Sequence, residues 1–89
     1  MAIIITYDVP NRHVQLKQAM FNMGYTDRIA HNNRYIYLPN TTVYHGNKTS
    51  EQALNDLQVI CGQLNIDLER CVSTQWGPDW AAIWGRPFN

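Results

Sequence analysis

The side chains best suited to catalysis in this sequence are an early aspartate and three histidines. Asp8 follows the apolar run 2–7, and His13 comes shortly after it. A carboxylate is a preferred ligand of Mg²⁺ and an imidazole titrates near neutral pH, so this pair suits metal-assisted hydrolysis with general acid or base help. One carboxylate alone is a poor magnesium site, and Asp8 could instead accept hydrogen bonds from amides of the following turn. His31 and His45 have no partner that the sequence reveals.

Cationic and aromatic side chains are interleaved between residues 28 and 48. Arginine and tyrosine together can hold single-stranded RNA, because the cation contacts phosphate and the ring stacks on a base. The same residue types are enriched in protein–protein interfaces, so the sequence leaves a protein partner open, and it also leaves open a plain solvated surface. The residues of this candidate nucleic-acid-binding surface are Arg28, Arg34, Tyr35, Tyr37 and Lys48.

Large aromatic rings recur at every fourth position near the end of the chain, at Trp76, Trp80, Trp84 and Phe88. These rings carry a large apolar area, and removing that area from water stabilises the contact that covers it. They can fold back on the sheet of their own chain, pack across a twofold axis on a second copy, or offer a platform on which bases stack. We expect a homodimer with these four residues at its interface.

Length, charge and cysteine usage limit the classes of function. The chain has 89 residues, 45% of them hydrophobic, which supports a single domain over 1–89 with 77–89 as a C-terminal tail. Seven basic residues balance seven acidic ones, so no overall positive field draws the protein onto duplex DNA or an anionic membrane. Cys61 and Cys71 lack CxxC spacing, and we expect buried thiols. The first apolar run has no basic segment ahead of it and is too short to span a bilayer, so we expect a cytoplasmic protein without membrane contact.

Turn and cap signals divide the sequence into predicted elements. Asn32 and Asn33 tolerate the positive φ of a tight hairpin turn. Gly24 favours a left-handed helix end, and Thr49 with Gln52 forms a capping-box pattern. The predicted elements are a strand over 2–7, a helix over 11–23, a hairpin of strands over 26–31 and 34–38, a helix over 49–65, and an edge strand over 68–76. Residues 40–48 are expected to form a polar loop, and residues 80–84 a short aromatic helix or turn.

This order of elements predicts an α+β fold, a ferredoxin-like βαββαβ sandwich. Right-handed crossovers place both helices on one face of a four-stranded antiparallel sheet. The opposite face of the sheet then has no helix over it. It must be polar or covered by a neighbour.

Short motifs at both ends of the chain are similar to known families. The opening Ile3-Ile4-Ile5-Thr6-Tyr7-Asp8-Val9-Pro10 resembles that of the CRISPR-associated protein two family, in which a strand ends in Tyr-Asp before a helix. The close, Thr74-Gln75-Trp76 followed by Asp79-Trp80, is similar to that of the virulence-associated protein D family. Uncharacterised small proteins of the same superfamily have a segment similar to Ala81-Ala82-Ile83-Trp84-Gly85.

The resemblance implies a ferredoxin-like homodimer that is a metal-dependent endoribonuclease or nuclease, or the structural partner of an integrase. It places Asp8 near the dimer axis, where two copies hold a divalent cation such as Mg²⁺, and it adds Arg12 to the nucleic-acid-binding residues. Asp8 and His13 are then the catalytic candidates and Asp8 the metal ligand. The neutral charge, the lack of a second acidic residue beside Asp8 in the candidate site and the aromatic tail instead favour a non-catalytic dimeric protein-binding module of a toxin, defence or phage inhibitor system, comparable to an anti-CRISPR protein.

Overall fold

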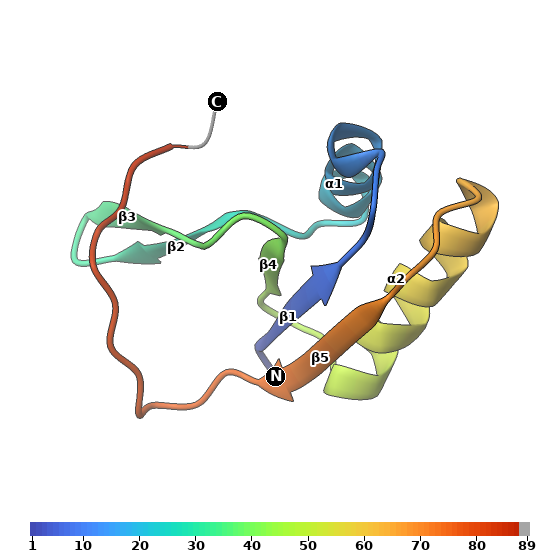
Figure 1. Cartoon of the computed structure of the whole chain (residues 1–89). Coiled ribbons are helices and arrows are strands. Elements are labelled where there is room, and N and C mark those ends of the chain that lie inside the picture. The colour runs from blue at the N-terminus through green and yellow to red at the C-terminus, as the bar shows by residue number, and fades with distance from the viewer. Residues whose placement is uncertain (88–89) are drawn as a thin grey trace.

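The computed structural model describes residues 1–87, which form an α+β fold with two helices and antiparallel strands (Figure 1). The elements in chain order are β1 (Ile3–Asp8), α1 (His13–Asn22), β2 (Arg28–His31), β3 (Arg34–Tyr37), β4 (Thr42–His45), α2 (Ser50–Gln63) and β5 (Arg70–Gln75). Neither helix in this part of the chain has the length and apolar character that a bilayer crossing requires.

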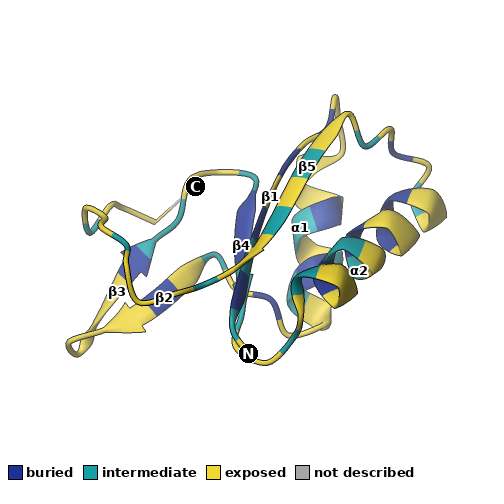
Figure 2. Cartoon of the chain, turned by 90° about the horizontal axis from the view of Figure 1, so that it is seen from below, coloured by how far each residue is buried: buried dark blue, intermediate teal, exposed yellow. Residues whose placement is uncertain are grey.

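β1 is the central strand of a three-stranded antiparallel sheet with the order β4-β1-β5, so the predicted central strand and edge strand are confirmed. Its side chains Ile3, Ile5 and Tyr7 are buried, whereas Thr6 and Asp8 are exposed. The alternation arises because successive side chains of a strand point to opposite faces. Both helices lie on one side of this sheet (Figure 2), and their buried residues share one core with Ile3, Ile5 and Tyr7. The rest of the core consists of Val9, Leu16, Met20, Tyr25, Val43, Ala53, Leu57, Ile60, Cys61 and Ile66.

The helices are bounded by local signals. Thr49 caps α2 as predicted: its hydroxyl accepts a hydrogen bond from the Gln52 amide at 3.1 Å, and the Gln52 side chain accepts one from the Thr49 amide at 2.9 Å. α1 begins after Arg12, which has a φ of 58° and makes no side-chain cap. Gly24 follows α1 with a φ of 92°, and a side chain there would meet His45 Nε2 at 3.1 Å. Both the backbone and the space therefore require glycine at position 24.

β2 and β3 form the predicted hairpin, which extends away from the helices (Figure 1). Asn32 and Asn33 make the turn with φ values of 49° and 62°, as a two-residue turn with two positive φ angles demands. The register pairs Ile29 with Ile36 on one face of the hairpin, and both are buried.

The expected four-stranded sheet is divided into a three-stranded and a two-stranded sheet. Segment 40–48, expected to be a loop, contains β4, and β4 is the strand that pairs with β1. The break before β4 has two causes, since Pro39 has no amide to donate and Thr41 has a φ of 63°. A bridge between Thr26 and Tyr44, with hydrogen bonds of 2.8 Å in both directions, links the two sheets.

The described part of the tail, 77–87, has no helix or strand, and the short helix or turn expected over 80–84 is not formed. The tail leaves β5 and runs to the β2–β3 hairpin of the same chain (Figure 1). There the Tyr37 amide donates a hydrogen bond to the Trp84 carbonyl at 3.0 Å. Gly85 follows with a φ of 71°, and a side chain there would meet the Tyr37 carbonyl oxygen at 3.1 Å. Phe88, predicted for a dimer interface, lies outside the described residues.

Candidate functional site

Arg28, Tyr35 and Tyr37 lie together on one face of the hairpin, which we call the hairpin face. Arg28 and Tyr37 are cross-strand partners, and Tyr35 stands two residues from Tyr37 on the same side of β3. The Arg28 guanidinium lies 5.0 Å from the centre of the Tyr37 ring and 5.8 Å from that of Tyr35. Tyr35 is 54% exposed. The hairpin face therefore presents a cation and the Tyr35 ring to solvent, with the half-buried Tyr37 ring beside the cation.

Asp27 fixes the Arg28 side chain. The Arg28 Nε donates a hydrogen bond to Asp27 Oδ1 at 2.9 Å, and this bond raises the pKa of the already cationic guanidinium. The other guanidinium nitrogens stay available for a ligand, because the bond uses only the Nε position. Asp27 also offsets part of the positive charge, so the hairpin face is more aromatic than cationic.

The opposite face of the hairpin meets the tail. His31 and Arg34 are cross-strand partners at the end of the hairpin. The His31 ring packs edge-on against Trp80, with 5.1 Å between centroids, and lies 6.1 Å from Trp84. The Arg34 guanidinium lies 4.0 Å from the centre of the Trp84 ring. These four residues form the hairpin–tail cluster.

The structure thus brings together Arg28, Tyr35 and Tyr37 on one face and Arg34 on the other face of the same hairpin. Sequence reasoning missed the joining of His31 and Arg34 to the tail tryptophans. The turn at 32–33 predicts that these two residues lie opposite each other in the hairpin, but it does not predict their contact with the tail. The sequence does not indicate which face of the hairpin the tail covers.

The three tail tryptophans that were predicted at a dimer interface have contacts within their own chain. Trp80 contacts His31, and Trp84 contacts Arg34. Trp76 stacks at an angle on Trp80, with 5.0 Å between ring centroids. The alternative in which the tail folds back on its own chain describes this arrangement, although the tail covers the hairpin rather than the three-stranded sheet.

Asp8, the predicted metal ligand, faces a cation. The Arg70 Nε donates a hydrogen bond to Asp8 Oδ2 at 2.8 Å, and both side chains are largely exposed. His13, its predicted catalytic partner, is exposed at the first turn of α1. Among residues 1–87, no three or more histidine, cysteine or acidic side chains are grouped so that they could hold a metal ion. The donor set of one chain does not fit Mg²⁺, which prefers octahedral oxygen ligands.

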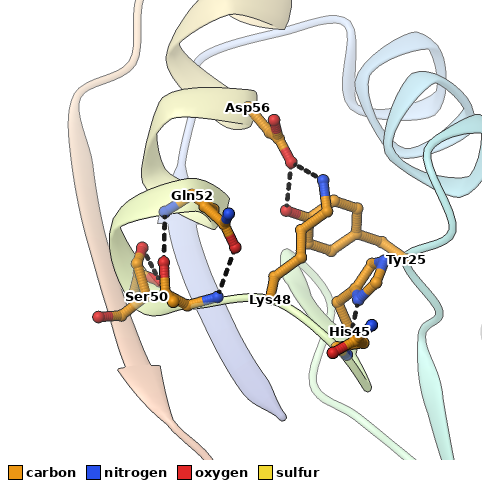
Figure 3. A network of polar contacts seen from close by, with 9 residues as sticks. Tyr25, His45, Lys48, Ser50, Gln52 and Asp56 are labelled. Carbon is orange, nitrogen blue, oxygen red and sulfur yellow. Dashed lines mark hydrogen bonds and ion pairs between the residues drawn. The ribbon is translucent and has the colours of Figure 1, made fainter. Parts of the chain in front are cut away.

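Arg12 and Lys48, the remaining predicted binding residues, lie elsewhere. The Arg12 Nη1 donates a hydrogen bond to the Leu64 carbonyl at 3.0 Å, which joins the start of α1 to the end of α2. Lys48 forms an ion pair with Asp56 of α2 (Figure 3). Both cations therefore serve contacts within the fold.

Asp56 is the centre of a polar network that sequence reasoning did not find (Figure 3). The Tyr25 hydroxyl donates a hydrogen bond to Asp56 Oδ2 at 2.8 Å, and the Lys48 ammonium lies 5.4 Å from the centre of the Tyr25 ring. Burial, with the nearby Asp56 carboxylate, raises the pKa of the Tyr25 hydroxyl well above its usual value. Tyr25 is thus a neutral hydrogen-bond donor at all physiological pH values.

His45 closes this network on the side of Gly24. Its ring packs edge-on against Tyr25, with 5.0 Å between centroids, and its Nδ1 accepts a hydrogen bond from the Asn47 amide at 3.0 Å. Burial and the positive charge of Lys48 lower the pKa of His45. This arrangement suits the neutral imidazole, whose unprotonated Nδ1 accepts the hydrogen bond from Asn47.

The two cysteines are free thiols: Cys61 is buried and Cys71 is half-buried. Burial raises the pKa of both thiols, which favours their protonated form. The expectation of buried thiols is confirmed for Cys61 and holds in part for Cys71.

No protein-family model, curated protein or solved structure matches the chain. The resemblance to the CRISPR-associated and virulence-associated families stays a prediction. The protein is therefore described by its own structure. It is an α+β domain with an exposed aromatic hairpin, and the C-terminal tail packs against one face of that hairpin.

Proposed function

We propose that this protein binds single-stranded RNA on the hairpin face and does not cut it. The observation that supports this most is the grouping of Arg28 with the rings of Tyr35 and Tyr37 on an exposed strand surface. Tyrosine rings stack on any base, and a neighbouring guanidinium contacts the phosphate or stacks in turn. Rings on a rigid hairpin lose little conformational freedom on binding.

The net charge of the chain indicates which interactions provide the affinity for RNA. With no net charge, the protein gains little from long-range attraction to phosphate. Arg28 and Arg34 are the cations of the hairpin itself. The free energy of binding then comes mainly from stacking, at about 1–3 kcal/mol per base. We expect modest affinity with weak sequence preference.

Metal-dependent cleavage is the activity that the family resemblance implies, and the arrangement around Asp8 gives it no support. The Arg70 guanidinium faces the one carboxylate that the resemblance assigns to the metal. A second carboxylate from another copy would have to displace this cation before Mg²⁺ could bind. We therefore expect RNA incubated with the protein and Mg²⁺ or Mn²⁺ to stay intact.

A homodimer remains part of the proposal because the sheet has a face without helices. Ile4, Thr6 and Asp8 point to this face from β1, and Val72 of β5 stands opposite Thr6 with 62% of its surface exposed. An exposed valine beside a half-buried isoleucine suits contact with a second copy. Sedimentation at micromolar concentration tests this: a dimer that Val72→Asp dissociates supports it, and a monomeric wild type contradicts it.

Fluorescence polarisation with a labelled oligouridylate tests RNA binding. Arg28→Ala and Tyr35→Ala should each weaken binding by roughly 5-fold or more, because each removes one stacking or charge contact. Arg70→Ala is the control, since it removes an exposed cation that lies outside the hairpin. Equal losses for Arg70→Ala and Arg28→Ala, or a wild type that binds no RNA, would overturn the proposal. In that case capture of a protein partner becomes the next experiment.

A further inference from the structure

A groove of about 440 Å³ runs between the β2–β3 hairpin and the tail. Its walls include the rings of His31, Trp80 and Trp84 and the side chains of Ile36 and Pro78. A volume of this size is within the range of sites that hold a small molecule. The groove lies on the side of the hairpin away from Tyr35 and Tyr37, so it is a surface separate from the hairpin face.

The rings that line the groove meet one another at an angle rather than face to face. His31 meets Trp80 edge-on at an interplanar angle of 72° and meets Trp84 at 39°. Neither contact is a parallel stack, and both tryptophans are only half-buried. Aromatic rings prefer offset-stacked or edge-to-face neighbours, and an entering ring could offer both at once.

A positive charge stands beside this aromatic wall. The Arg34 guanidinium lies 4.0 Å from the centre of the Trp84 ring, and Arg34 also lines a second hollow of about 370 Å³ that shares His31 with the groove. Arginine on an aromatic face keeps its outer nitrogens free for an anion. The groove therefore has aromatic walls, and a cation lies against the ring of one of its lining residues, Trp84.

We propose that this groove binds one nucleobase of a single-stranded RNA, with the adjoining phosphate on Arg34. This inference rests on the proposed function and names a second contact for the same ligand. The chemistry matches a nucleotide in both parts: the base is flat and uncharged, and the phosphate is anionic. The hairpin would then be held from both sides, with bases stacked on Tyr35 and one base in the groove.

The chain contains its own probe for this site. All three tryptophans of the sequence, at positions 76, 80 and 84, are at or near the groove, so tryptophan emission reports on no other region. Adenosine monophosphate should quench this emission with a saturable dependence on concentration. Ribose 5-phosphate, which has the phosphate but no base, should quench it little.

Two pairs of variants separate the base contact from the phosphate contact. Trp80→Leu should weaken the binding of adenosine monophosphate by roughly 5- to 150-fold, and Trp80→Phe should retain most of it, because stacking needs a ring. Arg34→Gln should weaken binding, whereas Arg70→Gln, at the far end of the sheet, should not. Arg34 is exposed, so its variant folds even if Trp80→Leu does not.

The inference fails if adenosine monophosphate does not quench the emission, or if ribose 5-phosphate binds as tightly as the nucleotide, since that result marks a phosphate site without base recognition. Its failure is distinct from that of the proposed function. If fluorescence polarisation shows that RNA binds but adenosine monophosphate does not quench the emission, the hairpin face remains supported as an RNA-binding surface and the groove does not. A mononucleotide that quenches while oligouridylate does not bind would overturn the proposed function and the RNA ligand named here, and would leave the groove as a mononucleotide site.

Discussion

The guanidinium of Arg34 lies over the ring of Trp84, 4.0 Å from its centre, and this contact joins the hairpin to the tail. A hydrogen bond from the Tyr37 amide to the Trp84 carbonyl lies beside it. The tail therefore has a place on its own chain, where it covers the face of the hairpin that contains Ile29 and Ile36. Because the tail packs on one face of the hairpin, Tyr35 and Tyr37 are held on the opposite face.

Attachment of the tail depends on the glycine after Trp84. Gly85→Ala places a methyl group 3.1 Å from the Tyr37 carbonyl oxygen on a backbone with φ of 71°. We expect the tail to detach, because a side chain at this φ costs about 1 kcal/mol and the close contact adds to it. A red shift of tryptophan emission and faster proteolysis of the tail would record this. Gly62→Ala is the matched control, since no atom lies within 4 Å of its added carbon, and it should stabilise the protein by about 0.5–1 kcal/mol. If Gly85→Ala leaves both emission and proteolysis unchanged, the docked tail is wrong.

The network around Asp56 should contribute to folding and not to binding. Asp56→Ala leaves the Tyr25 hydroxyl and the Lys48 ammonium without their shared acceptor. We expect a loss of about 1–3 kcal/mol in the free energy of unfolding, since partly buried polar groups lose their partner. Urea unfolding measures this, with the exposed Asp67→Ala as a control that should change little. Equal stability of the two variants would contradict the network.

Stability should fall in mild acid because of His45. Its pKa is lowered in the folded protein, so the unfolded chain binds a proton at pH values where the folded chain does not. Stability is then full above the usual histidine value of 6.5 and declines as the pH falls below it, until the pH drops under the folded pKa of His45. Urea unfolding between pH 7.5 and pH 5 measures the slope. His45→Gln should flatten it, and the exposed His13→Gln should not; the reverse result would assign the slope to another group.

Asp8 should prove dispensable for the fold. Its ion pair with Arg70 is exposed at both partners, and such pairs are screened by water and salt. We expect Asp8→Asn to leave the melting temperature unchanged, and we expect Mg²⁺ to leave the wild-type melting temperature unchanged as well. If Mg²⁺ clearly raises the melting temperature of the wild type and Asp8→Asn abolishes this rise, Asp8 belongs to a metal site and the nuclease interpretation is favoured.

RNA affinity should depend weakly on salt. If Arg28 and Arg34 neutralise two phosphates, the logarithm of the binding constant should fall with the logarithm of the salt concentration at a slope of about −1.4. Polarisation titrations over a range of sodium chloride concentrations give this slope, and Arg34→Gln should halve it. A slope several times steeper would indicate a cationic surface outside the hairpin.

The sequence predicted the helix caps and the hairpin turn, because these features depend on residues that are close together in the chain. The capping box of Thr49 and Gln52, the Asn32-Asn33 turn and the left-handed Gly24 are all observed. The strand β4 was missed because Pro39 suggested a loop up to Lys48. Pairing with β1 overrides that preference, and the four-stranded sheet is divided as a consequence.

The candidate site was predictable in composition but not in arrangement. Arg28, Tyr35 and Tyr37 meet because strand alternation and the hairpin register place them together, and both were readable from the sequence. Lys48 was assigned to the same surface by proximity in the chain, whereas it turns to Asp56 of α2. The docking of the tail depends on contacts between distant residues, which no local pattern encodes.

Photo-crosslinking of a 4-thiouridine oligoribonucleotide, followed by peptide mapping, tests the central claim most directly. We expect crosslinks in the hairpin, at Tyr35 or Tyr37, that are lost when unlabelled oligouridylate competes and are reduced in Arg28→Ala. Crosslinks confined to the helices or to β5, or none above the level of a denatured control, would contradict it.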